Sequence, residues 1–466
     1  MGKIHFFFGL WLLLIGLCSA VEDRVNFVFI VTDDLGIRDL GCYGSDYYET
    51  PHLDQLASEG IRFTKAYASA SVCSPTRASI LTGHYPHRVQ LTDALPWDRL
   101  YKNPKMVPPD HLKELPSSIA TYPQVFRKAG YRTALIGKWH LGNEHEFFQK
   151  KKHLDYGFDE AFDRNGKDKG VEALTAKSIA FIKKNKEKAF FLTLMHHTPH
   201  VPLTCPPEYK ARFAKKKPGR FQKNPTYAGM ISHLDDSMGK IFSTLESLGL
   251  AKKTVVVFCS DNGGLQKITS NRPYRGAKGN LYEGGILVPL ILRWPDKVAA
   301  GTSTDVKVLS SDFFPTFLEL AGLDLQPKSH QDGLSFASIL TGKSMPSRPL
   351  FWHFPHRGTP SSAIIKGDWK LIHFIETESY ELYNLKKDPS ERKDLFESQQ
   401  QKSLQLIALL KEHLQETNSQ MMHPNPSWEK SDLKGKAENF GIFYPGNGKS
   451  WQPVTKSYPS WFKHRE

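Results

Sequence analysis

Four short apolar runs, each followed at once by polar side chains, constrain most strongly what this chain can fold into. The runs are rich in β-branched and aromatic residues and cover Val25–Thr32, Thr133–Gly137, Ala189–Met195 and Thr254–Ser260. Helical patterns separate them, which is typical of βαβ units. The sequence therefore predicts an α/β fold with a large, mostly parallel sheet that is covered by helices on both faces.

The pattern changes near residue 361, where short strands replace the alternation of strands and helices. We expect strands at Ala363–Ile365, Trp369–Phe374 and Tyr380–Asn384, and then a helix near Gln399–Gln415. This order predicts a smaller C-terminal subdomain with an antiparallel sheet and one covering helix. We accordingly divide the chain into a leader (1–20), a catalytic body (21–358), this subdomain (359–418) and an aromatic and proline-rich tail (419–466) that packs on the body.

The first twenty residues have the features of a secretory signal. Lys3 precedes an apolar run from Phe6 to Leu17, and the small residues Ser19 and Ala20 follow. The run is too short to span a membrane, and no later stretch is long enough. A lipoprotein anchor on Cys18 is the alternative, although Leu17 is bulky where that processing prefers a small residue. We expect a secreted or periplasmic protein without a transmembrane segment.

The net charge of +14 predicts a polyanionic partner. Lysines gather in clusters at 150–152, 183–184 and 215–217. The alternative for each cluster is an ordinary solvated basic surface. The sequence contains no nucleic-acid-binding motif, so we expect no nucleic acid among the partners.

Carboxylate and amide side chains follow two of the four apolar runs. Asp33 and Asp34 come after the first run, and Asp261 and Asn262 come after the fourth. In a parallel sheet the carboxyl ends of the strands meet at one edge, so these side chains can converge. Hard oxygen ligands suit Ca²⁺ or Mg²⁺ and disfavour zinc. The alternative is that Asp33 and Asp261 only cap helices.

Cys73 precedes a segment with helix-start signals. Ser74 can cap a helix, Pro75 suits the first helical position, and Gly83 can end the helix. The positive end of that helix would stabilise an anion near Cys73. The alternative for an isolated cysteine is a small buried apolar residue.

The segment Cys73-Ser74-Pro75-Thr76-Arg77 resembles the Cys-x-Pro-x-Arg motif of the type I sulfatases of the alkaline phosphatase superfamily. The match continues through residues 78–83, and the resemblance spans nearly the whole mature sequence. It implies that a maturation enzyme converts Cys73 to formylglycine and that the hydrate of this aldehyde is the nucleophile. The family is expected to bind Ca²⁺, with Mg²⁺ as the less favoured ion.

The resemblance also implies a role for each residue of the site. The expected metal ligands are Asp33, Asp34, Asp261, Asn262 and the modified Cys73. The other expected catalytic residues are Arg77, Lys138, His140, His200 and Lys278. His200 is chosen over His196 and His197 because of its proline neighbours. Asp312 also fits the family pattern, but we interpret it as a structural helix cap.

These residue types suit the cleavage of a sulfate ester. Fixed cations can oppose the charge on the nonbridging oxygens, which is usually the largest catalytic contribution. In the expected reaction His200 or Lys278 protonates the departing alcohol, and His140 takes the proton that allows sulfate to leave.

The expected substrate is a sulfated poly- or oligosaccharide, because the basic surface suits an anionic polymer. Loops 84–97 and 352–357 are expected to set the specificity. Their candidate substrate-binding residues are His84, His87, Arg88, Trp97 and His356. Two alternatives remain: a phosphate or phosphonate monoester hydrolase of the same superfamily, and a catalytically silent polyanion-binding protein.

Overall fold

The computed structural model describes residues 24–95, 105–164, 166–356 and 358–428. The predicted leader, Trp97 and the tail beyond residue 428 lie outside this part of the chain. No helix among the described residues is long and apolar enough to cross a membrane.

In the described residues, nine strands form the large sheet, with the path order β10-β2-β8-β7-β1-β6-β4-β5 and β9 paired with β2. All pairs are parallel except those of β8 with β2 and β7, which confirms the predicted mostly parallel sheet. The strands are β1 (Asn26–Thr32), β2 (Ile61–Tyr67), β4 (Arg132–Gly137), β5 (Glu160–Phe162), β6 (Phe190–Met195), β7 (Thr254–Ser260), β8 (Leu287–Arg293), β9 (Thr302–Thr304) and β10 (Val308–Leu309).

The four apolar runs form the adjacent strands β7, β1, β6 and β4 at the centre of the sheet. Val28 of β1 pairs with Leu192 of β6 and with Val256 of β7, so these three strands run side by side in the same direction. The carboxyl ends of all four strands therefore lie along the same edge of the sheet.

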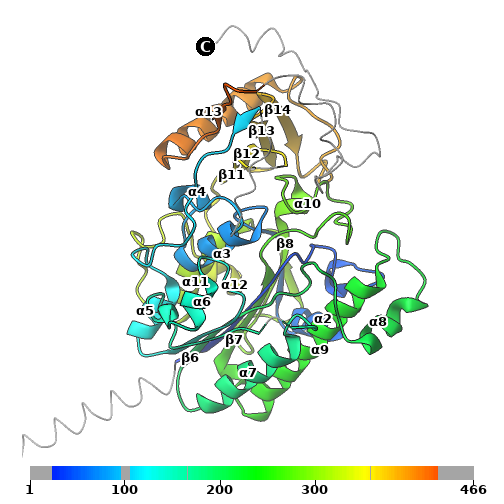
Figure 1. Ribbon diagram of the computed structural model, residues 1–466, viewed down its shortest axis with the longest axis vertical. Helices are drawn as coiled ribbons and strands as arrows, with labels where there is room; N and C mark the ends of the chain where they lie inside the picture. The colour runs from blue at the N-terminus through cyan, green and yellow to red at the C-terminus, as the bar shows by residue number, and fades with distance from the viewer. Residues whose placement is uncertain (1–23, 96–104, 165, 357, 429–466) are drawn as a thin grey trace, which may run out of the picture.

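Helices cover both faces of this sheet (Figure 1), as predicted. On one face lie α2 (Pro51–Ser58), α7 (Val171–Lys184) and α9 (Pro225–Ser247). On the other lie α3 (Cys73–Thr82), α5 (Tyr122–Lys128), α11 (Phe313–Leu320) and α12 (Ala337–Leu340). Short helices in the connections are α4 (Pro86–Val89), α6 (Glu144–Phe148), α8 (Pro207–Ala214) and α10 (Glu283–Ile286).

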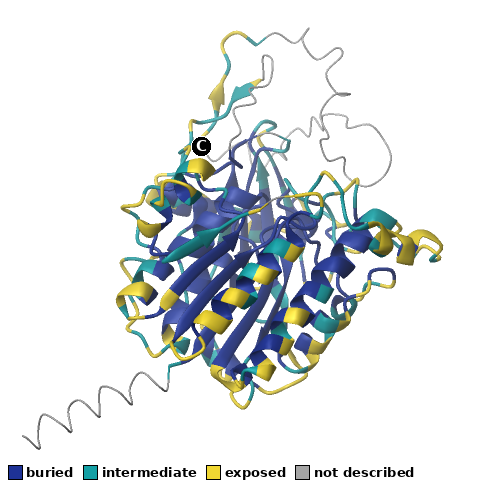
Figure 2. Ribbon diagram, turned by 60° about the horizontal axis from the view of Figure 1, so that its bottom comes forward, coloured by how far each residue is buried: buried dark blue, intermediate teal, exposed yellow. Residues whose placement is uncertain are grey.

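Side chains of β1 alternate between two apolar cores. Val28 and Ile30 pack with the first helix layer, whereas Phe27 and Phe29 pack with the second. The rings of Phe27 and Phe191 stack with centroids 4.9 Å apart. Figure 2 shows the result, with buried strands between helices whose exposed residues face outward. Burial on both faces explains why the strands read as continuous apolar runs.

The second sheet is antiparallel, as predicted, and has the order β11-β12-β13-β14. Its strands are β11 (Leu350–Phe354), β12 (Ser361–Lys366), β13 (Trp369–Phe374) and β14 (Ser379–Asn384). The predicted helix, α13 (Gln400–Glu416), packs on one face through a small apolar core of its own. The expected loop 352–357 was wrong in its first part, because residues 352–354 belong to β11. A separate pair joins β3 (Met106–Val107) to β15 (His423–Pro424).

A buried lysine joins the second sheet to the body. The Nζ atom of Lys370 on β13 lies 3.0 Å from Glu283 Oε1 and 2.8 Å from Glu391 Oε1, and all three side chains are fully buried. Glu283 is the first residue of α10, and its backbone N–H donates to Glu391 at 2.7 Å. Burial, opposed by Lys370, raises the pKa of Glu391 to about 7.

We expect Lys370→Met to lower the free energy of unfolding by about 3–5 kcal/mol, because it removes the nearest cation from two buried carboxyl groups. Urea denaturation measures this change. Lys366→Met, at an exposed position on neighbouring β12, is the matched control and should alter the free energy by less than about 0.5 kcal/mol. Equal stability of the two variants would contradict the assignment.

Three buried histidines meet where α4, α13 and the second sheet pack together. His87 Nε2 lies 2.9 Å from His413 Nε2, and the rings of His87 and His353 have centroids 6.0 Å apart. Burial lowers the pKa of His353 and of His413 to about 4, and it lowers that of His87 well below the ordinary value. The folded protein therefore keeps these rings neutral.

This cluster predicts a loss of stability in mild acid. Between about pH 6.5 and pH 4 the unfolded chain binds protons that the folded chain does not, so the free energy of unfolding falls as the pH falls through this range. Urea midpoints measured across the range should show a smaller decline for His413→Gln. His145→Gln, at an exposed position, is the matched control, and an identical decline in both variants would contradict the explanation.

Candidate active site

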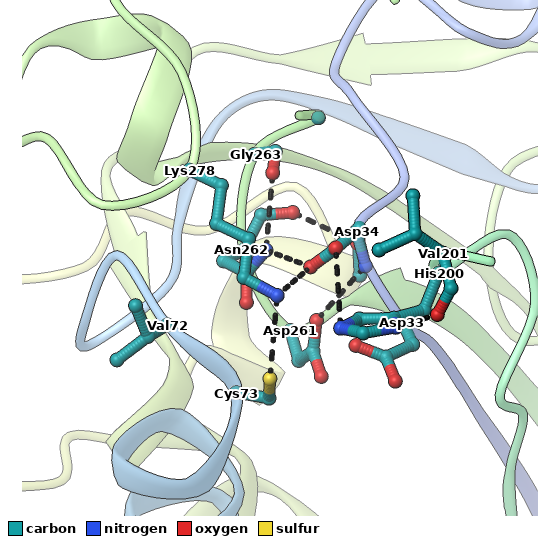
Figure 3. A network of polar contacts seen from close by, with 12 residues as sticks. Asp33, Asp34, Val72, Cys73, His200, Val201, Asp261, Asn262, Gly263 and Lys278 are labelled. Atoms are coloured by element: carbon teal, nitrogen blue, oxygen red, sulfur yellow. Dashed lines mark hydrogen bonds and ion pairs between the residues drawn. The ribbon is translucent and has the colours of Figure 1, made fainter. Parts of the chain in front are cut away.

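Polar side chains that follow β1, β6 and β7 converge at the carboxyl edge of the sheet (Figure 3). Asp33 and Asp34 follow β1, Asp261 and Asn262 follow β7, and Lys138 follows β4. The backbone of Asp34 is left-handed, with φ 67°, a conformation that aspartate tolerates better than most residues. This turn brings the Asp34 N–H to 3.3 Å from Asp261 Oδ1.

Cys73 is the first residue of α3, which is buried along its whole length. Gly83 ends the helix in a left-handed conformation with φ 67°, as predicted. The predicted start was wrong: the helix begins two residues earlier than Pro75 implied, and Val72 stands at the capping position without a side-chain cap. Ser74 instead accepts a hydrogen bond from the Leu95 N–H, and its Oγ lies 3.1 Å from His140 Nδ1. Cys73 still occupies the positive end of the helix.

Arg77, one turn further along α3, is fully buried and holds Asp261. Its Nε and Nη2 atoms lie 2.9 and 2.8 Å from Asp261 Oδ2, and its Nη1 donates to the Lys138 carbonyl at 3.2 Å. One guanidinium group thus connects the ends of β7 and β4. Removing it would leave a buried carboxylate without its partner.

Two lysines pair with the two carboxylates that follow β1. Lys138 Nζ lies 2.6 Å from Asp33 Oδ2, and Lys278 Nζ lies 2.6 Å from Asp34 Oδ1. Lys278 Nζ is also 3.6 Å from Cys73 Sγ. The loop that carries Lys278 is fixed by hydrogen bonds from the Lys278 N–H to the Gly264 carbonyl and from the Gly279 N–H to the Ser71 carbonyl.

Burial and neighbouring charges shift the pKa values of this cluster in different directions. Burial raises the pKa of the Cys73 thiol to about 11. Burial, together with the charge of Asp33, raises the pKa of Asp261 to about 7 against the opposing effect of Arg77. Burial also favours the neutral form of Asp33, but Lys138, His200 and Arg77 hold its pKa well below the ordinary value. Burial alone would lower the pKa of Lys278, but the negative charges of Asp34 and Cys73 raise it above the ordinary value.

The cluster contains a set of oxygens suited to a hard cation. The buried atoms Asp33 Oδ1, Asp34 Oδ2 and Asn262 Oδ1 have no hydrogen-bond partner among the described residues. Possible ligand atoms of Asp33, Asp34, Cys73 and His200 lie within 4.8 Å of one another. Buried polar atoms are normally paired, so these three oxygens are candidates for holding a hard cation.

Of the three clustered histidines, His200 is the one that the structure places against the carboxylates. Its Nε2 lies 3.7 Å from Asp34 Oδ2, and its Nδ1 lies 2.6 Å from the Val201 carbonyl oxygen. His197 instead contacts Asp163 at 2.8 Å. His196 is fully buried, and burial lowers its pKa to about 3.

Comparisons with known proteins agree with this arrangement. The family described as Sulfatase matches residues 25–323, which is more than half of the sequence. The chain belongs to the sulfatase family. Its members hydrolyse sulfuric esters. A second match, described as N-sulphoglucosamine sulphohydrolase, C-terminal, covers residues 277–420.

Individual relatives of this sulfatase come from animals and bacteria. N-acetylgalactosamine-6-sulfatase of Mus musculus is 29% identical, with 78% of this chain and 75% of the relative covered. A protein named Sulfatase from Formosa agariphila is 29% identical, with 88% and 91% covered. The crystal structure of Ps i-CgsB in complex with k-i-k-neocarrahexaose is similar with a TM-score of 0.75 and 27% identity, over 88% of this chain and 96% of that one.

The predicted substrate-binding residues lie apart from the carboxylate and lysine cluster around Cys73 or have other partners. His84 and Arg88 follow the far end of α3, where both contact Asp332. His87 belongs to the buried histidine cluster, and His356 Nε2 lies 2.8 Å from Thr92 Oγ1. Asp312 accepts hydrogen bonds from the Leu309 and Leu334 N–H groups, but its side chain does not cap α11 as predicted.

Two residues that sequence reasoning missed also belong to this neighbourhood. Lys169 is buried, and burial lowers the pKa of its ammonium group. The nearby charge of Asp33 raises this pKa, and that of Lys138 lowers it. Ser74 orients His140 through the contact described above. Neither residue directly follows a strand, so the strand-end rule that located Asp33, Asp34 and Asp261 could not find them.

We expect a divalent cation to stabilise this sulfatase. After dialysis against a chelator, adding Ca²⁺ at about one hundred times its dissociation constant should stabilise the fold by about 2.7 kcal/mol, which thermal melting detects as a higher Tm. Asp34→Asn should remove most of this increase, because it takes a charge from the oxygen cluster. Asp324→Asn, at an exposed position away from the carboxylate cluster, is the matched control and should keep the increase; an unchanged response in Asp34→Asn would contradict the cation site.

Proposed function

We propose that this sulfatase hydrolyses sulfate esters of carbohydrates and that Cys73, oxidised to formylglycine, supplies the nucleophile. The observation that carries the proposal is the position of Cys73 at the first turn of α3. There it lies 3.6 Å from Lys278 Nζ and beside the unpartnered oxygens of Asp33 and Asp34.

The chemistry of the surrounding residues supports the oxidation of Cys73. The neighbouring candidate ligands are carboxylate and amide oxygens, which match hard cations, whereas a thiol is a soft ligand. An oxygen at the same position would make the set uniformly hard. When formed, the hydrated aldehyde offers one hydroxyl to attack sulfur and a second through which the sulfate can be released.

Each polar residue of the cluster has a proposed task. Lys138 and Lys278 oppose the negative charge of the sulfate oxygens, and Arg77 holds Asp261 and the Lys138 carbonyl in place. His200 or Lys278 donates the proton to the departing alcohol. His140 accepts a proton from the second hydroxyl; burial and Lys138 lower its pKa well below the ordinary value, so its ring is neutral and can do so.

We propose Ca²⁺ as the resident ion, held by Asp33, Asp34, Asp261, Asn262 and the modified Cys73. The ion would neutralise the buried carboxylates and polarise the sulfate group. Mg²⁺ is less favoured because it usually keeps several waters and binds through one or two carboxylates, whereas this cluster offers several buried protein oxygens.

A sulfated carbohydrate is the proposed substrate class. The names of the relatives refer to an N-acetylgalactosamine sulfate and to a bound neocarrahexaose, and the net charge of +14 suits an anionic chain. We also propose that the leader directs the chain to secretion or the periplasm and that a formylglycine-generating enzyme is its maturation partner.

Side-by-side assays of nitrophenyl sulfate and nitrophenyl phosphate test the reaction class. We expect sulfate to be preferred and Cys73→Ser to lose at least about 10³-fold in kcat/KM, because the serine lacks the second hydroxyl. Cys259→Ser, a buried cysteine on β7 that the mechanism does not use, is the matched control.

Two results would overturn this proposal. A strong preference for phosphate would indicate a phosphate or phosphonate monoester hydrolase, and binding of sulfated polymers without any hydrolysis would indicate a silent homologue. Mass spectrometry of the peptide that contains residue 73 reports the modification independently, as a loss of about 18 Da relative to cysteine.

A further inference from the structure

A basic groove of about 1180 Å³ lies between loops of the body and the loop that follows β14. Among its described lining residues, six carry a positive charge and only Glu391 carries a carboxylate. The cationic residues are Arg38, Arg220, Lys223, Arg272, Arg275 and Arg392. Glu391 is already bound to Lys370, so the groove presents almost only positive charge.

Most of these cations lack an internal counter-charge. Arg275 lies 3.5 Å from Glu381, but no ion pair to a carboxylate joins the other five among the described residues. Arg38 donates to the Gly44 carbonyl, which is neutral. Such a concentration of positive charge in a concave surface attracts an anionic ligand with several charges.

The groove also offers flat apolar surfaces. Phe221 and Tyr274 are partly exposed lining residues, and the guanidinium of Arg220 lies 5.0 Å from the Phe221 ring centroid. Aromatic faces next to fixed charges can hold a ring that carries both carbon–hydrogen faces and anionic groups. A sulfated or carboxylated sugar chain has this combination.

The wall of the groove and the candidate active site are parts of one loop. Asn271, a lining residue, exchanges two hydrogen bonds with the backbone of Gly264, at 2.9 and 3.2 Å. Gly276 also lines the groove, and two residues later Lys278 reaches Asp34 and Cys73. Two residues of extended chain span at most about 7 Å, so the rim of the groove begins close to the nucleophile.

The lysine clusters at 150–152, 183–184 and 215–217 do not line the groove. In each cluster one lysine has a carboxylate partner: Lys152 pairs with Glu114, Lys184 with Glu160 and Lys216 with Glu49. The positive charge of the groove therefore comes from its own arginines and Lys223.

We infer that the groove binds further anionic sugar units of a sulfated oligosaccharide whose target sulfate lies at Cys73. This assignment rests on the proposed function, because that function defines which sulfate is removed. The preferred substrate is then a chain of sugars, because the volume of the groove exceeds that of a typical small-molecule site.

The test compares Arg272→Ala/Arg392→Ala with the matched control Lys183→Ala/Lys188→Ala. Both double variants remove two exposed positive charges, but the control lies at the amino-terminal edge of the large sheet. With a carrageenan-derived and a chondroitin 6-sulfate hexasaccharide, the groove variant should raise KM about tenfold or more, because charged hydrogen bonds are lost. Its kcat/KM for nitrophenyl sulfate should stay unchanged, and the control should match the wild type on all substrates.

Calorimetric binding separates this inference from the proposed function. In the Cys73→Ser background, the groove substitutions should weaken binding of a sulfated hexasaccharide about tenfold, and desulfated hexasaccharides should bind weakly to both proteins. If the wild type hydrolyses no sulfate ester but this loss of binding is seen, the proposed function fails and the groove assignment stands. Unchanged binding overturns the groove assignment whatever the activity is, and so does tighter binding of a single-stranded oligonucleotide than of either hexasaccharide.

Discussion

The site depends on burying carboxylates and cations together. Asp33, Asp34 and Asp261 lie within one small region at the carboxyl edge of the sheet, and each has a cationic partner in Lys138, Lys278 or Arg77. Any of these charges alone would be costly to bury. The pairing leaves oxygens beside Cys73 that have no hydrogen-bond partner among the described residues, and it fixes the direction in which the lysines point.

Much of this arrangement could be predicted because it follows from strand periodicity. Apolar runs buried on both faces marked β1, β4, β6 and β7, and parallel strands bring their carboxyl ends to one edge. That rule places Asp33, Asp34 and Asp261 in one region from the sequence alone. The resemblance carried by residues 73–77 added Arg77 and Lys278, which lie outside the strand ends.

The remaining features depend on contacts between distant parts of the chain, which local patterns do not contain. Ser74 looks like a helix cap in the sequence, but its hydroxyl is engaged with His140 and Leu95, so the helix starts earlier. The strand β11 covers only five residues, and its pairing with β12 is what identifies it as a strand. The basic groove could not be predicted either, because its arginines come from separate loops and become neighbours only in the fold.

The buried contact of Lys370 with Glu283 and Glu391 limits how this protein can be rearranged. Glu283 opens the short helix α10 next to the Lys278 loop, whereas Lys370 and Glu391 come from the second sheet and the loop after it. The C-terminal region is therefore not an interchangeable module. A chimera that joins this body to the C-terminal region of another sulfatase would have to carry matching partners across the junction, and sequence change on one side constrains what the other side can accept.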